Sequence, residues 1–179
     1  KNGALVHTDA VQAVGNIDVD VEELGVDFLS LSGHKFGGPK GIGVLYIRHG
    51  APFCNFISGG HQERGRRGGT LNTQGIVGIG AAASVQSETR AATEVEIRRL
   101  RDRLRSGIET RVPDIHVNGH PTDCLPGTLN ISFLGAEGES LLLYLDLAGI
   151  AVSTGSACAS GSLDPSRVLL ATGIGAELA

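Results

Sequence analysis

The feature that most constrains the fold is a series of short apolar runs, each ending in polar residues or glycine. Residues 4–6, 28–31 and 43–47 have the length of buried strands, and a short helical stretch is expected near residues 19–24. This alternation predicts an α/β sheet, in which the strand ends carry the chemistry. Functional residues are therefore expected where the first two strands end, in the polar stretch and the glycine-rich loop that follow them.

The second half of the chain shows a similar alternation after one long helix. A helical stretch is expected to begin near Thr73, apolar residues recur at helical spacing from Ile97 to Ile108, and Pro113 closes this helix. We place a domain boundary near Ala92, giving domains 1–92 and 93–179. The expected elements beyond Pro113 are strands near 115–117 and 128–133, a helix over 139–147, a strand at 150–152 and a helix that begins at Asp164-Pro165.

Charge, hydropathy and cysteine usage exclude several classes of function. A net charge of −4 gives no electrostatic footprint for nucleic acid. No apolar run approaches the roughly 18 residues that span a membrane, and the first residues lack a signal-peptide layout. Cys54, Cys124 and Cys158 are odd in number and far apart, so neither a disulfide framework nor a resident metal site is indicated. We expect a reducing, cytoplasmic setting.

The absence of methionine, even at position 1, suggests an internal fragment of a longer protein. Generic nucleotide motifs also fail. Residues 33–38 have P-loop spacing, but Pro39 stands where the lysine should be.

Lys35 occupies an unusual place for a lysine. It follows the end of a predicted strand, among the hydroxyl of Ser32, the imidazole of His34 and glycine backbone, all suited to an anion. A lysine beside a phosphate-binding loop can form a Schiff base with an aldehyde cofactor. Asp9, at another strand end, could offer its carboxylate to a pyridinium nitrogen. The alternative is an ordinary solvated lysine.

Three segments carry a family resemblance. Residues 7–12, residues 30–41 and residues 153–158 resemble, in this order, the bacterial cysteine desulfurases of the class V aminotransferase family. These enzymes supply sulfur for iron–sulfur clusters. The resemblance implies the α/β fold type I of pyridoxal-phosphate-dependent transferases. It makes residues 1–92 the C-terminal part of the large cofactor-binding domain, and residues 93–179 most of the small domain.

The resemblance implies pyridoxal 5′-phosphate as cofactor and a role for each matched residue. Lys35 would hold the cofactor covalently and later shuttle a proton. Asp9 would pair with the pyridine nitrogen, and Gln12 would bind the ring phenolic oxygen. The other matched residues would bind phosphate: Ser32, Gly33 through its backbone, His34, and Thr70, which would reach the cofactor of a homodimer partner.

Cys158 is the candidate nucleophile. It lies among small and hydroxyl residues that form no apolar face, as a thiol that attacks bound substrate requires. The resemblance implies that L-cysteine gives L-alanine and a persulfide on Cys158, which passes to a sulfur acceptor or iron–sulfur scaffold protein. Through that persulfide Cys158 could also be a transient iron–sulfur ligand.

Three alternatives stay open from the sequence. The first two are a selenocysteine lyase and a class V aminotransferase, which share the fold and cofactor. The third is a chain that only dimerises or docks onto an acceptor. No residue here matches the family's ring-stacking histidine or its substrate-carboxylate arginine.

Overall fold

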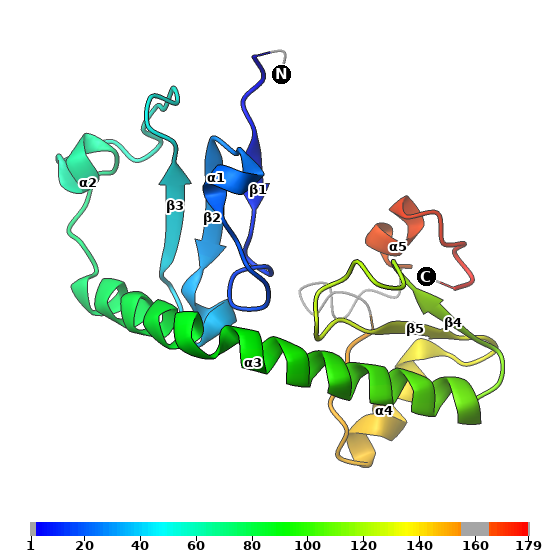
Figure 1. Ribbon diagram of the computed structural model, residues 1–179. Helices are drawn as coiled ribbons and strands as arrows, with labels where there is room; N and C mark the ends of the chain where they lie inside the picture. Colours follow the sequence, from blue (N-terminus) through cyan, green and yellow to red (C-terminus); the bar gives the residue numbers. More distant parts are fainter. Residues whose placement is uncertain (1–2, 155–164, 179) are drawn as a thin grey trace. The chain divides into compact units, whose positions relative to one another are not determined.

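The computed structural model describes residues 3–154 and 165–178 (Figure 1). The chain forms two compact units, Lys1–Ile97 (unit 1) and Arg98–Ala179 (unit 2). The division falls within helix α3 (Thr73–Arg111), which the sequence predicted as one long helix. The boundary expected near Ala92 lies in this same helix.

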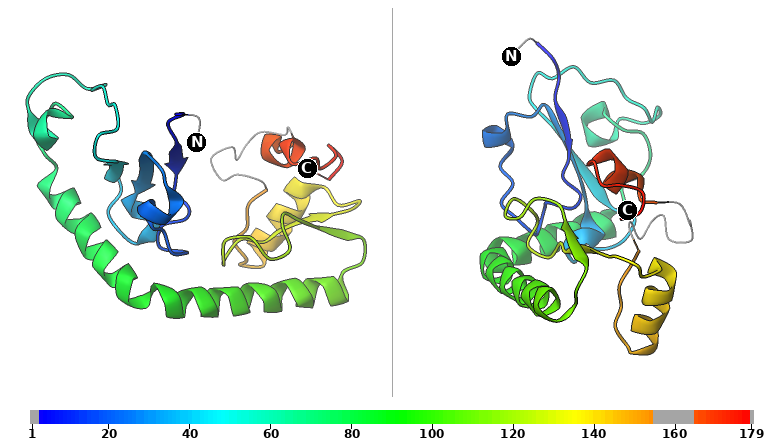
Figure 2. Two further views of the ribbon diagram at one scale, coloured as in Figure 1. Left: turned by 45° about the horizontal axis from the view of Figure 1, so that its top comes forward. Right: turned by 90° about the vertical axis from the view of Figure 1, so that its right-hand side faces the viewer.

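Unit 1 is built on a three-stranded sheet in the order β1-β2-β3 (Figures 1 and 2). Its strands are β1 (His7–Asp9), β2 (Phe28–Ser32) and β3 (Gly43–Ile47). β1 runs parallel to β2, and β3 runs antiparallel to it. Because β1 and β2 are parallel, both end at the same edge of the sheet.

The first strand was predicted at residues 4–6, but β1 begins three residues later, at His7. The apolar run still contacts the sheet, since the Val6 carbonyl accepts hydrogen bonds from the Asp27 and Phe28 amides, at 2.8 and 3.1 Å. Pairing between backbones, rather than hydrophobicity, sets where β1 begins. The predicted strand over 43–47 is confirmed as β3.

The two faces of this sheet differ in character. Leu29 is 2% exposed and packs with Ala10 and Val26, while Leu31 and Tyr46 lie against this cluster. Successive side chains of a strand point to opposite faces. The polar residues at odd positions of β1 and at even positions of β2 therefore share the other face: His7, Asp9, Ser30 and Ser32.

The segment after β2 is anchored to α3. It contains a short 3₁₀ helix, η1 (Gly33–Phe36), where the sequence predicted only a loop. Phe36 is buried, and its carbonyl accepts a hydrogen bond of 3.3 Å from Gln86 Nε2 on α3. A methyl group added at Gly78 would lie 2.5 Å from Pro39 Cγ. These contacts fix the loop that carries Lys35.

Two short helices complete unit 1. Asp20 Oδ1 caps α1 (Val21–Leu24) by accepting from the amides of Glu22 and Glu23. The sequence did not predict α2 (Gln62–Gly65), because Glu63 and Arg64 adopt left-handed conformations that non-glycine residues rarely take.

Unit 2 contains the antiparallel pair β4 (Ile115–Asn118) and β5 (Asn130–Phe133), followed by α4 (Gly138–Leu147) and α5 (Arg167–Ala171). The strand pair and α4 confirm the predictions. The strand expected at 150–152 is wrong, since these residues have no strand pairing. The last helix begins at Arg167 with Ser166 as its cap, and so starts after Asp164-Pro165.

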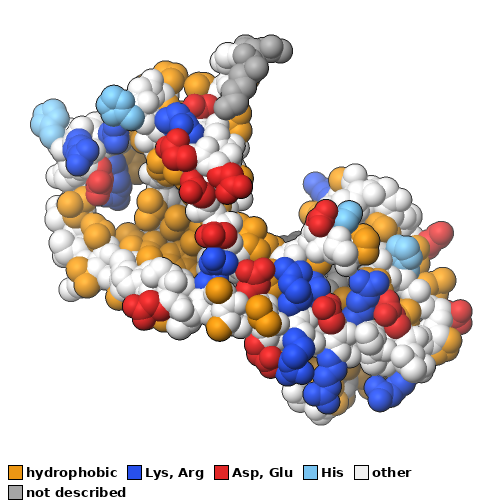
Figure 3. Space-filling model, viewed as in Figure 1, with side chains coloured by type: hydrophobic (Ala, Val, Ile, Leu, Met, Phe, Trp, Pro, Cys, Tyr) orange, Lys and Arg blue, Asp and Glu red, His pale blue; other side chains and the backbone are white. Residues whose placement is uncertain are grey.

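Within the described residues, no helix is long and apolar enough to cross a membrane. Hydrophobic side chains are exposed on unit 1, between β3 and the first half of α3 (Figure 3). Val44 and Leu45 on β3 are each 46% exposed, and Val77 on α3 is 71% exposed.

Candidate functional site

Asp9 stands at the end of β1 with one carboxylate oxygen already engaged. Its Oδ1 accepts a hydrogen bond of 2.9 Å from the Val11 amide, two residues further along the chain. This local contact fixes the carboxylate orientation. Its other oxygen, Oδ2, has no hydrogen-bond partner among the described residues. The side chain can therefore accept a hydrogen bond from a cationic N–H group of a ligand.

Ser32 and His34 form a second polar pair, at the end of β2. Ser32 Oγ and His34 Nδ1 are 2.9 Å apart, with Ser32 half-buried and His34 exposed. The contact orients the imidazole and leaves Nε2 without a partner among the described residues. A hydroxyl and an imidazole held side by side in this way suit a phosphate group.

Gly33 lies between them but has no free backbone amide. Its N–H donates to the Ile42 carbonyl at 2.9 Å, and its own carbonyl accepts from the amides of Gly37 and Gly38. An added methyl group would lie 3.1 Å from Ile42 Cγ2 and 3.2 Å from Ile79 Cδ1. The structure thus places Gly33 in close packing, with its N–H already bonded to the Ile42 carbonyl.

Lys35 is exposed in η1, directly before the buried Phe36. The buried ring holds the backbone while the amine side chain remains accessible. Gln12 is also exposed, in the turn after β1, where its carbonyl accepts from Asn16 Nδ2 at 3.0 Å. Strand register therefore brings one set of predicted residues to one sheet edge: Asp9, Gln12, Ser32, Gly33, His34 and Lys35.

The remaining predicted residues lie elsewhere. Thr70 is exposed in the segment before α3, next to Gly69, whose φ of +101° only glycine adopts readily. Asn72 then caps α3, its Oδ1 accepting from the Gly75 amide at 3.0 Å. Cys158 lies outside the described residues.

Sequence reasoning missed one pair on this face of the sheet. His7 Nε2 lies 2.8 Å from Ser30 Oγ, and each residue stands two positions before the end of its strand. The alternation of side chains along a strand could have indicated it, because His7 and Asp9 are two residues apart and share a face.

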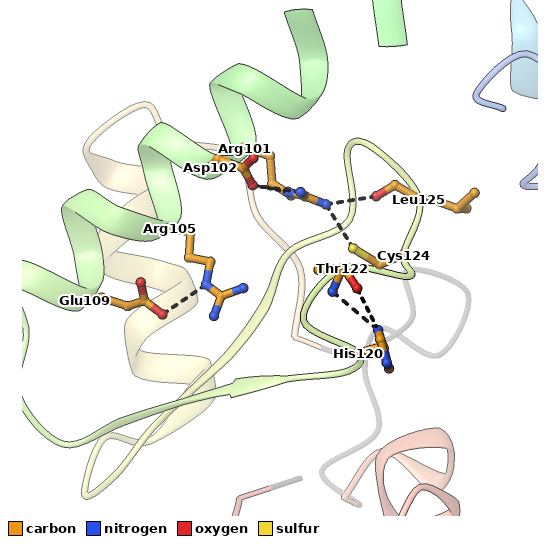
Figure 4. Close-up of polar contacts among 8 residues, drawn as sticks. All are labelled: Arg101, Asp102, Arg105, Glu109, His120, Thr122, Cys124 and Leu125. Carbon is orange, nitrogen blue, oxygen red and sulfur yellow. Dashed lines mark hydrogen bonds and ion pairs between the residues drawn. The ribbon is translucent and has the colours of Figure 1, made fainter. Parts of the chain in front are cut away.

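Unit 2 holds a separate polar network around Arg101 on α3 (Figure 4). The Arg101 side chain is only 9% exposed and binds Asp102 Oδ1 at 2.7 Å. Its Nη1 also donates to Cys124 Sγ at 2.9 Å and to the Leu125 carbonyl at 3.4 Å. The hydrogen bond to Asp102 raises the pKa of Arg101 above its ordinary value. Arg101 thereby ties the loop before β5 to α3.

A family model decides what kind of chain this is. The model for aminotransferase class V matches residues 1–174. The chain belongs to the class V aminotransferase family.

Curated relatives agree with this assignment. A protein of Clostridium botulinum named cysteine desulfurase IscS is 53% identical over 176 residues, covering 97% of this chain and 44% of that protein. A cysteine desulfurase of Sinorhizobium fredii is 51% identical over 173 residues, covering 97% of this chain and 45% of that protein. The class V chain thus spans less than half the length of these relatives.

Solved structures resemble the class V chain as well. A NifS-like protein matches with a TM-score of 0.85 and 39% identity, over 97% of this chain and 44% of the other. DndA from Streptomyces lividans matches with a TM-score of 0.76 and 35% identity, over 97% of this chain and 49% of the other. These likenesses confirm the predicted α/β class and fold type I.

Proposed function

We propose that the protein to which this chain belongs is a pyridoxal-phosphate-dependent cysteine desulfurase. One observation carries the proposal: the oriented Asp9 carboxylate, whose Oδ2 has no partner within the described part of the chain, shares a sheet edge with the accessible amine of Lys35 on an anchored turn. The relatives named cysteine desulfurase support the reaction class. Units 1 and 2 would correspond to the C-terminal part of the large domain and most of the small domain.

The donor set at this edge fits the groups of pyridoxal phosphate. Lys35 supplies a primary amine for the aldehyde, and Asp9 Oδ2 supplies an acceptor for the ring N–H. Ser32 and His34 supply donors for the phosphate, and Gln12 a donor for the phenolic oxygen. When bound, the cofactor supplies an electron sink that makes the C–S bond of cysteine breakable.

The protein's own groups would do the remaining work. The Asp9 carboxylate would accept the ring N–H and so favour the protonated ring nitrogen, because a nearby negative charge favours the charged form of its partner. The Lys35 amine would also carry a proton to and from the substrate carbon. The buried Phe36, which directly follows Lys35, would hold the Lys35 backbone at the sheet edge during this proton transfer.

Cys158 would accept the sulfur. Its thiolate would attack the sulfur atom of cysteine, forming an S–S bond as the C–S bond breaks, and protonation of the remaining carbon would give L-alanine. The persulfide would then pass to a sulfur-acceptor or iron–sulfur scaffold protein. We also propose a homodimer in which Thr70 reaches the partner's cofactor, and a cytoplasmic location.

Covalent labelling tests the cofactor assignment. The full-length protein, loaded with pyridoxal phosphate, is reduced with borohydride and digested, and the labelled peptide is mapped. We expect the pyridoxyl group on Lys35. Lys40, five residues further along the same loop, is the internal control, and a label there would contradict the assignment.

A further inference from the structure

His7 and Ser30 form a cross-strand contact that the proposed chemistry does not use. His7 Nε2 on β1 and Ser30 Oγ on β2 are 2.8 Å apart, a hydrogen-bond distance in either tautomer of the ring. His7 pairs with Phe28 in the strand register, so the contact to Ser30 reaches diagonally along the sheet. It links the two strands in addition to their backbone hydrogen bonds.

The contact lies next to Asp9. The strand register pairs Asp9 directly with Ser30, and His7 precedes Asp9 by two residues on the same face. Ser30 is therefore the cross-strand neighbour of Asp9 and the hydrogen-bond partner of His7 at once. If β1 moved along β2, Asp9 would change position and the His7–Ser30 contact would break at the same time.

Contacts of the preceding residue also hold β1: the Val6 carbonyl accepts from the Asp27 and Phe28 amides, and the Val6 amide donates to Asp27 Oδ2 at 2.9 Å. The His7–Ser30 pair adds a side-chain contact on the face that carries Asp9. The strand has only three residues, and in the described chain it pairs with β2 alone. At its far end, the Ala10 amide donates to the Ser30 carbonyl at 2.9 Å, so Ser30 contacts β1 through backbone and side chain. The other polar pair of the site, Ser32 and His34, belongs entirely to the β2 end.

We infer that His7 and Ser30 are positioning residues, which set the distance from the Asp9 carboxylate to the phosphate-binding pair Ser32–His34. The inference rests on the proposed function, because it assumes a ligand that engages both ends at once. The ring nitrogen and the phosphate of pyridoxal phosphate are a fixed distance apart. If β1 slid along β2, the ligand could contact either Asp9 through its ring nitrogen or Ser32–His34 through its phosphate, but not both.

Cofactor affinity and ring protonation in the full-length protein test this. Variants Ser30→Ala and His7→Leu remove the contact, while Ser30→Thr keeps the hydroxyl. Ser84→Ala is the matched control, because it deletes a serine hydrogen bond to the Gly80 carbonyl on α3 of the same unit. Pyridoxal phosphate labelled with ¹⁵N at the ring reports protonation through its chemical shift.

We expect Ser30→Ala and His7→Leu to raise the dissociation constant about two- to tenfold, as the loss of one hydrogen bond predicts. Their ¹⁵N shift should move toward that of the neutral ring, while Ser30→Thr and Ser84→Ala match the wild type. A purely structural role would lower stability without moving the ¹⁵N shift.

The inference fails if Ser30→Ala and His7→Leu bind like Ser84→Ala, or if Ser30→Thr is as impaired as Ser30→Ala. Failure of the proposed function has a different signature. In that case the wild-type protein itself would bind no pyridoxal phosphate, or would carry the reduced label on a residue other than Lys35.

Discussion

Two glycines of α3 make a matched test of how the lysine-bearing loop is held. Gly78 and Gly80 both lie within the helix, so replacing either with alanine favours the helix by about 0.5–1 kcal/mol. At Gly80 the new methyl group meets nothing within 4 Å. At Gly78 it would lie 2.5 Å from Pro39 Cγ and 2.9 Å from Pro39 Cδ.

The stability difference between the two variants isolates this contact. The proline ring is rigid and cannot rotate away, so the loop itself must shift, at the cost of about 1–3 kcal/mol typical of overpacking. Because the helix gain is common to both, Gly80→Ala should be more stable than Gly78→Ala by that amount. Urea unfolding of the full-length proteins measures the difference.

Gly78→Ala should also weaken cofactor binding, because Pro39 lies four residues from Lys35 on the same loop. Absorbance titration with pyridoxal phosphate measures this effect. Equal stability and equal cofactor affinity in the two variants would refute the argument that α3 positions the loop.

Two further predictions concern unit 2 and the dimer. Arg101→Met should destabilise the protein by about 1–3 kcal/mol, since it removes the guanidinium that donates a hydrogen bond to the Leu125 carbonyl. The pKa of Arg101 is raised in the folded state, so its contribution is full below the unfolded pKa and is lost only above the folded one. Urea unfolding should therefore give the same loss at about pH 6 and about pH 7, and a loss that differs between them would contradict this. In mixed dimers of full-length Lys35→Ala and Thr70→Ala chains, one site should carry both defects and the other neither, restoring about half of wild-type activity. Activity no higher than in either mutant homodimer would contradict the shared site.

The parts of the fold that sequence reasoning found are those governed by periodicity. The apolar spacing of α3 and the short apolar run of β3 predicted elements that the structure has, and Pro113 follows the helix end at Arg111. Run length and helical spacing are local properties, so the sequence shows them directly. The same reasoning failed for β1, whose bounds depend on backbone pairing with β2 rather than on the hydrophobicity of residues 4–6.

The candidate site was predictable in composition but not in its supporting contacts. Asp9 and Lys35 stand out because charged groups follow strand ends. The packing of Pro39 against Gly78 joins residues far apart in sequence, and no local pattern indicates it. The left-handed backbone at Glu63 and Arg64 is equally hidden, because these residue types do not favour it.

The most direct test of the central claim replaces Cys158 with serine in the full-length protein and measures alanine and persulfide from L-cysteine. Cys54→Ser, which changes a cysteine that is exposed on unit 1, is the control. Cys158→Ser should keep the cofactor on Lys35 but form no persulfide and release almost no alanine, while Cys54→Ser behaves like the wild type. Alanine release by Cys158→Ser at near wild-type rates would contradict the assignment of Cys158 as the sulfur acceptor.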